Sequence, residues 1–240
     1  MWGDGVLLDI SCREGVMVAF WFISVSIAEY VGYLVMVLAL FRYPVKYYWP
    51  QILFTSSICS LMSYVMSVDN DVAGAPLIQL AVLIICMCLM FHTPLLWSVI
   101  ICISTFVAFI IFQGGIIYLF YSFGWVPPVI PKTSISIYLI QSLTAATELL
   151  IAYYLIRKRI GFLFVPTSRE HNYVWNSTGI YLFIGSILSF ILLIIVYFAY
   201  THTNIAWFPV VLGILSILAI LLLIIMRRKN SEYVDKPWTR

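Results

Sequence analysis

Two carboxylic acids interrupt long apolar stretches of the sequence, and they are the residues best suited to chemistry there. Glu29 lies near the middle of the first stretch and Glu148 lies within the fifth. No lysine or arginine falls inside any apolar stretch, so neither glutamate has a basic partner in one. An ionised side chain at the centre of a bilayer costs on the order of 3 kcal/mol. If these stretches span a membrane, each glutamate is either protonated or faces a hydrated cavity.

Polar side chains recur around both glutamates at helical spacing. Residues three or four apart share one face of a helix. In the first stretch such a face holds Ser26, Glu29, Gly32 and Tyr33. In the fifth it holds Tyr138, Gln141, Thr144, Ala145 and Glu148. With Gln113 from the fourth stretch, we predict an outward-facing pocket for a ligand or a proton that is lined by Glu29, Gln113, Gln141 or Glu148. The order of the helices in the bundle is not encoded in the periodicity, so the sequence leaves open whether the two glutamates share a site. The alternative is structural: a neutral glutamate hydrogen-bonded to Gln141 or to a tyrosine.

A thiol and an imidazole form a third candidate site. Cys88 and His92 are four residues apart, which is one helical turn, and a thiolate beside an imidazole is the core of a cysteine nucleophile. No aspartate or asparagine that could orient the imidazole is close in sequence, so we favour a function without catalysis. No sequence motif for a phosphate-binding loop or a zinc protease is present, and we expect no cofactor and no metal.

The composition indicates which solvent surrounds these residues. Of 240 residues, 63% are hydrophobic and 10% are charged, with a mean hydropathy of +1.05. A soluble domain carries about 25% charged residues, so this chain has too few polar groups to cover a water-facing surface. The net charge of +3 does not indicate nucleic-acid binding, because the lysines and arginines lie at the ends of the apolar stretches. The partner that the composition predicts is the lipid bilayer.

A transmembrane helix needs roughly 20 apolar residues. Seven stretches approach this length, and we predict an all-α bundle of about seven spans. They are Val16–Phe41, Gln51–Val68, Pro76–Phe91, Leu95–Phe120, Ser134–Ile156, Thr178–Tyr200 and Ile205–Met226. The third stretch is short and only a minimal turn separates it from the fourth. If these two do not both cross the membrane, the count is six.

The basic residues predict the orientation of the spans. With the N-terminus outside and seven alternating spans, eleven lysines and arginines lie inside and two, Arg13 and Lys132, lie outside. This asymmetry follows the positive-inside rule. Residues 1–15 then form an extracellular segment, 16–226 the transmembrane domain and 227–240 a cytoplasmic polar tail. We expect that tail to be disordered or to form a short interfacial segment.

Several segments resemble a known family. They are Phe41-Arg42-Tyr43-Pro44, Tyr47-Tyr48-Trp49, Pro76-Leu77-Ile78-Gln79-Leu80, Tyr138-Leu139-Ile140-Gln141 and Arg157–Pro166. Together they resemble the membrane sensor half of quorum-sensing receptor histidine kinases of the accessory-gene-regulator type, from Gram-positive bacteria. The resemblance implies a peptide signal that binds from outside, and a plasma membrane location. After Met226 the dimerisation helix and the ATP-binding domain of that family do not follow, so the resemblance implies a sensor without its kinase.

Three functions remain open. The first is a receptor-like or accessory signalling protein that binds a peptide or small-molecule ligand and acts through a cytoplasmic or membrane partner. The second is a small-solute or proton-coupled transporter that uses Glu29 and Glu148, although transporter folds usually contain internal repeats and none is visible here. The third is an intramembrane thiol enzyme that uses Cys88 and His92.

Overall fold

The computed structural model describes residues 4–70, 74–127, 134–165, 177–202 and 208–234. The last residues of the polar tail and most of two predicted loops, at 128–133 and 166–176, lie outside this part. So do Lys132, Arg169, Lys236 and Arg240, which contribute to the charge count. Within the described residues the chain is all-helical, with seven α-helices and no strands. They are α1 Asp4–Leu40, α2 Trp49–Ser63, α3 Ala75–Met90, α4 Leu95–Ser122, α5 Ile135–Lys158, α6 Ser177–His202 and α7 Phe208–Val234. A 3₁₀ turn, η1 (Val45–Tyr47), precedes α2, and a π-helical segment, η2 (Tyr64–Asp69), follows it.

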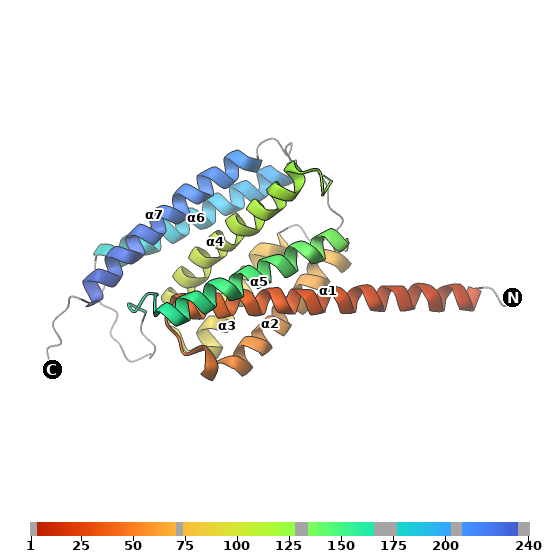
Figure 1. Ribbon diagram of the computed structural model, residues 1–240, viewed down its shortest axis with the longest axis horizontal. Coiled ribbons are helices and arrows are strands. Elements are labelled where there is room, and N and C mark those ends of the chain that lie inside the picture. The colour runs from red at the N-terminus through yellow and green to blue at the C-terminus, as the bar shows by residue number, and fades with distance from the viewer. Residues whose placement is uncertain (1–3, 71–73, 128–133, 166–176, 203–207, 235–240) are drawn as a thin grey trace.

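The helices coincide with the predicted stretches except at the two ends of the chain. The first helix begins at Asp4 rather than Val16, and its N-terminal part extends beyond the other helices (Figure 1). The last helix continues past Met226 to Val234, so disorder is wrong for residues 227–234, whereas a short interfacial segment stays a prediction. Both differences have one cause. Hydropathy detects the part of a helix that lies in hydrocarbon, whereas backbone hydrogen bonds can continue the helix into water.

Helix termini follow local sequence signals. Ser134 accepts a hydrogen bond from the backbone N–H of Ile137 and caps the start of α5. Helices α2 and α3 each have proline in the first turn, where a missing N–H costs no helical hydrogen bond. At the other end of α5, Arg159 adopts a left-handed conformation with φ of 53° and ends the helix. Local sequence signals thus define where α2 and α3 begin and where α5 begins and ends.

Helix α4 lies between two groups of helices. On one side α1 packs most extensively against α5 and also against α2, while α3 contacts α2 and α4. On the other side α6 and α7 pack on each other and on α4. Helices α1 and α5 run side by side in the same direction, and α4 runs in the opposite direction (Figure 1). This arrangement places faces of α1, α4 and α5 around one interior region.

The outer surface of the bundle is apolar. Helix α6, for example, exposes Ile184, Leu188, Ile191 and Ile195 along one face. Five of the described helical stretches are long and apolar enough to cross a membrane. They are Val16–Leu40, Trp49–Val68, Leu95–Ser122, Ile135–Lys158 and Thr178–Ile195. Helix α3 is apolar but shorter, with 16 residues. The architecture is therefore that of a membrane-embedded helical protein.

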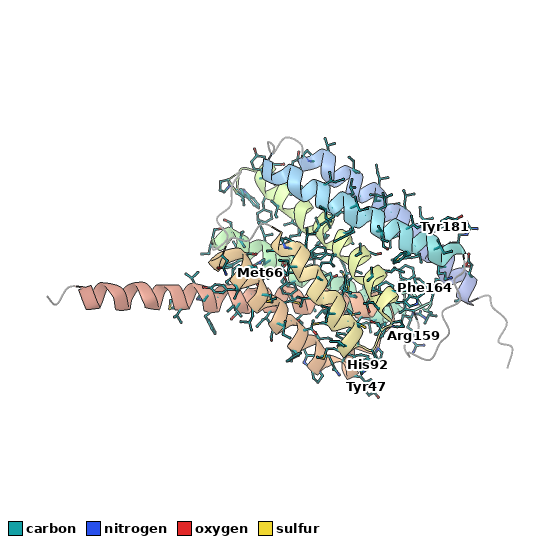
Figure 2. All side chains as sticks on the ribbon, turned by 180° about the vertical axis from the view of Figure 1, so that it is seen from behind. Tyr47, Met66, His92, Arg159, Phe164 and Tyr181 are labelled. Atoms are coloured by element: carbon teal, nitrogen blue, oxygen red, sulfur yellow. The ribbon has the colours of Figure 1, made fainter. Side chains whose placement is uncertain are left out.

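An aromatic cluster closes one end of the bundle. The rings of Phe41, Phe162 and Phe164 lie with centroids 5.5–6.3 Å apart, and Trp97 lies 5.3 Å from Phe164. Tyr47, His92, Arg159 and Phe164 lie at this end, and Met66 lies at the other (Figure 2). The cluster joins the ends of α1 and α5 to the start of α4, so this end is held by side-chain packing rather than by α-helical hydrogen bonds.

Candidate functional site

Glu29 projects from the middle of α1 into the interior and is only 6% exposed. The side-chain amide of Gln113, on α4, donates a hydrogen bond from Nε2 to Glu29 Oε1 at 2.6 Å. A hydrogen bond to a carboxylate is short and strong when the acceptor is ionised, and it also forms with the carbonyl oxygen of the neutral acid. The contact brings together residues 84 positions apart in sequence.

Gln141, on α5, places a second amide beside the same carboxyl group. Its side chain is close enough to Glu29 to influence that carboxyl group. Within the described residues its own carbonyl oxygen, Oε1, is buried and accepts no hydrogen bond. Glu29 is therefore bonded by the amide of Gln113 and has the amide of Gln141 beside it, and the Oε1 of Gln141 is an unused acceptor next to the carboxyl group.

Glu148 lies two turns further along α5 and is 2% exposed. Both of its carboxyl oxygens are buried, and among the described side chains neither has a hydrogen-bond partner. It is close enough to Glu29 and to Tyr33 for electrostatic interaction. A buried polar group without a hydrogen bond costs about 1–3 kcal/mol, so Glu148 is the less satisfied of the two acids.

A close approach of α1 and α5 creates this environment. A Cβ atom added to Gly32 would lie 3.0 Å from Glu148 Oε2 and 3.1 Å from the carbonyl oxygen of Ala145. Small residues at such an interface let two membrane helices approach closely. Gly32, one helical turn after Glu29, is thus the part of α1 that contacts Glu148.

A tyrosine and a threonine link α1 to α4 beside the site. The hydroxyl groups of Tyr33 and Thr105 are 2.8 Å apart and hydrogen-bonded, and the Tyr33 ring meets Phe109 edge-on at 5.6 Å. Thr105 was not among the residues selected from the sequence. Its signal was available, because Thr105, Phe109 and Gln113 follow one another at four-residue spacing and therefore lie along one face of α4.

All four predicted site residues thus converge at the meeting point of α1, α4 and α5. We call Glu29, Gln113, Gln141 and Glu148 the carboxylate–amide site. No lysine or arginine of the sequence lies in the apolar stretches, so any negative charge here requires a proton or a ligand to balance it. Among the described residues no group of three or more histidine, cysteine, aspartate or glutamate side chains could hold a metal ion.

Cys88 and His92 do not share a helix face, and that expectation was wrong. Helix α3 ends at Met90, and His92 follows it with a left-handed φ of 53°. His92 is exposed while Cys88 is half-buried, and no hydrogen bond joins the two side chains in the described part of the chain. Pro94 explains the early end of α3. A proline disfavours the helical conformation of the residue before it, here Thr93, so helices commonly end a few residues before a proline.

Comparison of the chain with protein-family models, with curated proteins and with solved structures finds no match.

Proposed function

We propose that this chain is a receptor-like or accessory signalling protein of the plasma membrane, whose ligand is bound at the carboxylate–amide site. In the proposed topology the N-terminus is outside, seven spans alternate and the C-terminus is cytoplasmic. Supporting this orientation, Arg42, Arg159 and Arg227 lie together at one end of the bundle although they come from three distant segments. The charge count assigns all three to the inner side.

One observation carries the proposal: four polar residues from three helices meet in an apolar interior without a cation. Their unpaired atoms are all acceptors, namely both oxygens of Glu148 and the Oε1 of Gln141. A group that donates several hydrogen bonds, such as an ammonium or guanidinium group of a peptide or small molecule, complements them. The proposed ligand class is therefore cationic and rich in donors.

A route to the cytoplasmic side accompanies the site. Glu29 and Gly32 lie on α1, and the same helix ends at Leu40, whose carbonyl oxygen accepts a hydrogen bond from Phe162 N at 2.7 Å. Phe162 belongs to the segment that follows α5. A ligand that separates α1 from α5 at Gly32 would therefore strain the junction between Leu40 and Phe162. A partner protein bound to that junction would then bind more or less tightly when the ligand is present.

Photocrosslinking tests the signalling role. Tyr47 is 82% exposed in the turn between α1 and α2 and projects from the proposed cytoplasmic end, so a photoreactive residue there should trap a partner in native membranes. We expect one discrete adduct whose yield changes at least about fivefold with Glu148→Gln, which corresponds to a weak coupling free energy of about 1 kcal/mol. Glu232→Gln, at the end of α7, is the matched control and should leave the yield unchanged. An adduct that is indifferent to Glu148→Gln would contradict signalling from this site.

A proton-coupled transporter is the second candidate, because two buried glutamates without a basic partner could carry protons between the two sides. In proteoliposomes with a pH-sensitive dye inside, an imposed potential should drive proton entry. Glu29→Gln and Glu148→Gln should each abolish that entry, whereas Glu232→Gln should not. Entry retained in both variants would exclude proton coupling through these residues.

Cysteine labelling tests the topology. Cys12, in the proposed extracellular segment, is first replaced by serine. The other four cysteines are buried or half-buried, which gives a low background. Trp125→Cys, between α4 and α5, should react with a membrane-impermeant maleimide in intact cells, because Trp125 is 68% exposed on the proposed outer side. Tyr47→Cys should react only after permeabilisation. The reverse pattern would invert the orientation.

A further inference from the structure

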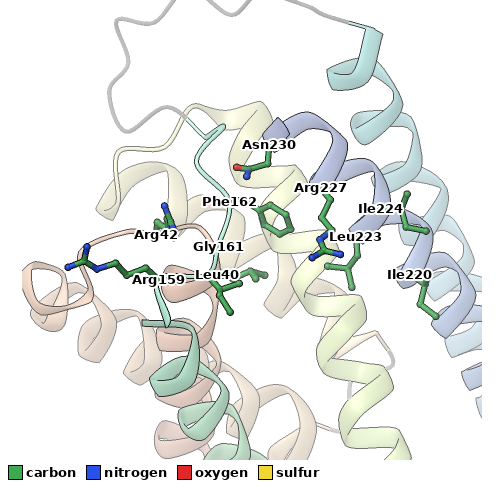
Figure 3. Close-up of a pocket in the computed structure, with 11 residues that line it drawn as sticks. Leu40, Arg42, Arg159, Gly161, Phe162, Ile220, Leu223, Ile224, Arg227 and Asn230 are labelled. Carbon is green, nitrogen blue, oxygen red and sulfur yellow. The ribbon is translucent and has the colours of Figure 1, made fainter. Parts of the chain in front are cut away.

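A cavity of about 530 Å³ opens at the end of the bundle where α1 and α5 stop and the last turns of α7 pass by. Its rim is basic and one wall is apolar (Figure 3). The rim residues are Arg42, Arg159, Arg227 and Asn230; the apolar wall on α7 is Ile220, Leu223 and Ile224. We call this the arginine pocket. It is separate from the carboxylate–amide site, which lies deeper in the bundle.

The pocket carries positive charge without an acidic partner. No aspartate or glutamate lines it, and in the described part of the chain none of its three arginines forms an ion pair. Glu232, the nearby acid on α7, instead accepts a hydrogen bond from Thr178 and pairs with Arg228 at 3.8 Å. Arg227 points into the pocket from α7, whereas Arg42 and Arg159 lie on the opposite side, with the Arg159 side chain directed away from α7 (Figure 3). All three are exposed and have the reach to turn toward an anion.

The floor of the pocket is built by close backbone packing. A Cβ atom added to Gly161 would lie 2.6 Å from the carbonyl oxygen of Leu40, so only glycine fits there without a shift. Beside it, Asn230 accepts a hydrogen bond from Leu163 N at 2.7 Å, which ties α7 to the segment after α5. The two sides of the pocket are therefore held at a defined separation before any ligand binds.

The apolar wall of the pocket indicates that the ligand has an apolar part in addition to an anionic group. Ile220, Leu223 and Ile224 share one face of α7 and are 56%, 47% and 58% exposed. They precede Arg227 by one to two helical turns on α7, in the part of the helix that we propose lies in the hydrocarbon. An inorganic anion would contact the arginines and leave this wall unused, whereas an amphiphile would cover both.

From this arrangement we propose that the arginine pocket binds an anionic phospholipid, with its phosphate at Arg42, Arg159 and Arg227 and an acyl chain along Ile220, Leu223 and Ile224. Guanidinium groups bind phosphate oxygens through paired, charge-assisted hydrogen bonds. Basic pockets between membrane helices on the cytoplasmic side suit the head groups of anionic lipids. A bound lipid would bridge the end of α1, the segment after α5 and α7, which stabilises the junction that these segments form.

Native mass spectrometry of the full chain tests the proposal. The protein is purified from vesicles of equal parts phosphatidylglycerol and phosphatidylcholine, and the retained lipids are counted. Each basic residue near a membrane surface contributes about 1 kcal/mol, or about a fivefold change in retention. We expect the combined Arg42→Gln, Arg159→Gln and Arg227→Gln variant to lose the preference for phosphatidylglycerol. The matched control, with Arg157→Gln, Lys158→Gln and Arg228→Gln, removes the same charge outside the pocket and should retain it.

Two further arms separate a lipid from a free anion. Leu223→Trp fills the apolar wall without a change of charge, and it should lower phosphatidylglycerol retention while leaving the melting temperature within a few degrees of the parent. Inorganic phosphate and glycerol phosphate, added at millimolar concentration, should not displace the lipid. Equal losses in both triple variants would overturn the proposal in favour of diffuse surface charge. Displacement by inorganic phosphate together with indifference to Leu223→Trp would overturn it in favour of a simple anion site.

Discussion

The surroundings of the two intramembrane glutamates differ although the residues are identical in type and close in space. Glu29 accepts a hydrogen bond from the amide of Gln113 on α4, and the amide of Gln141 on α5 lies beside it. Glu148 faces the bare backbone of α1 at Gly32, and within the described structure its oxygens have no hydrogen-bond partner. The carboxyl group of Glu29 thus has a hydrogen-bond partner within the protein, whereas that of Glu148 is left for a proton or a ligand.

The difference separates stability from function. A polar group that is fully bonded stabilises the helix arrangement that supplies its partners. A buried polar group without hydrogen-bond partners destabilises the protein when no ligand is bound. A ligand that forms those hydrogen bonds removes this cost, so the position of such a group indicates where a ligand would bind. We therefore propose that Glu29 holds α1, α4 and α5 together and that Glu148 is the residue that contacts the ligand. Three substitutions test this division.

The largest expected effect is at the interface that the two glutamates share. Gly32→Val would force α1 away from the backbone of Ala145, which cannot move as a side chain can. Overpacking of this kind costs about 1–3 kcal/mol, and we expect the upper end of that range. Thermal unfolding in detergent, followed by the fraction that remains monodisperse after heating, measures the loss.

Gly115→Val is the matched control for this substitution. Gly115 lies on α4, and an added Cβ there meets nothing within 4 Å. The control should unfold near the temperature of the parent protein. A similar loss in both variants would show that valine in the helix, rather than the contact between α1 and α5, is the cause.

The next effect compares the glutamates directly. Glu29→Leu leaves the amide of Gln113 without its acceptor, whereas Glu148→Leu removes a group that bonds to nothing in the described structure. Because an orphaned buried amide costs about 1–3 kcal/mol, Glu29→Leu should be less stable than Glu148→Leu by about that amount. Chemical denaturation of the two variants in the same detergent measures the difference. Equal stability, or the reverse order, would remove the distinction between a structural and a ligand-binding glutamate.

The smallest effect concerns the hydrogen bond between Tyr33 and Thr105, which supports the position of α1 on α4. Hydrogen bonds between membrane helices average about 0.6 kcal/mol in double-mutant cycles. Tyr33→Phe, Thr105→Val and the double variant should give a coupling free energy of about this size. A coupling near zero would leave the contact of Gln113 with Glu29 as the main polar link between α1 and α4.

The sequence was sufficient to select the candidate residues but not to pair them. Glu29 and Glu148 stand out because carboxylates are rare in apolar stretches, and Gln141 because it shares a helix face with Glu148. Periodicity shows which residues share a face of one helix, but not which helix packs against that face. Only the packing of α4 against α1 places Gln113 at Glu29, and no spacing in the sequence encodes that contact.

The failed pairing of Cys88 with His92 shows the same limit at shorter range. The four-residue spacing implied one helical face, but that inference holds only while the helix continues. Helix α3 ends at Met90, two residues before His92, and the backbone of His92 adopts a left-handed conformation instead of continuing the helix. A local pattern is informative within an element and loses its meaning where the element ends.

The sequence by itself determined that the chain is a set of apolar helices, which stretches are long and apolar enough to cross a membrane, and which residues interrupt them. These properties follow from the transfer of side chains between water and lipid, which depends on residue type alone. The tertiary structure alone decided that Glu29 receives the amide of Gln113 while Glu148 receives no hydrogen bond, and that three arginines share one pocket. Inside a bilayer apolar surfaces of all helices are nearly equivalent, so the choice of neighbours depends on shape and close packing, which hydropathy does not record.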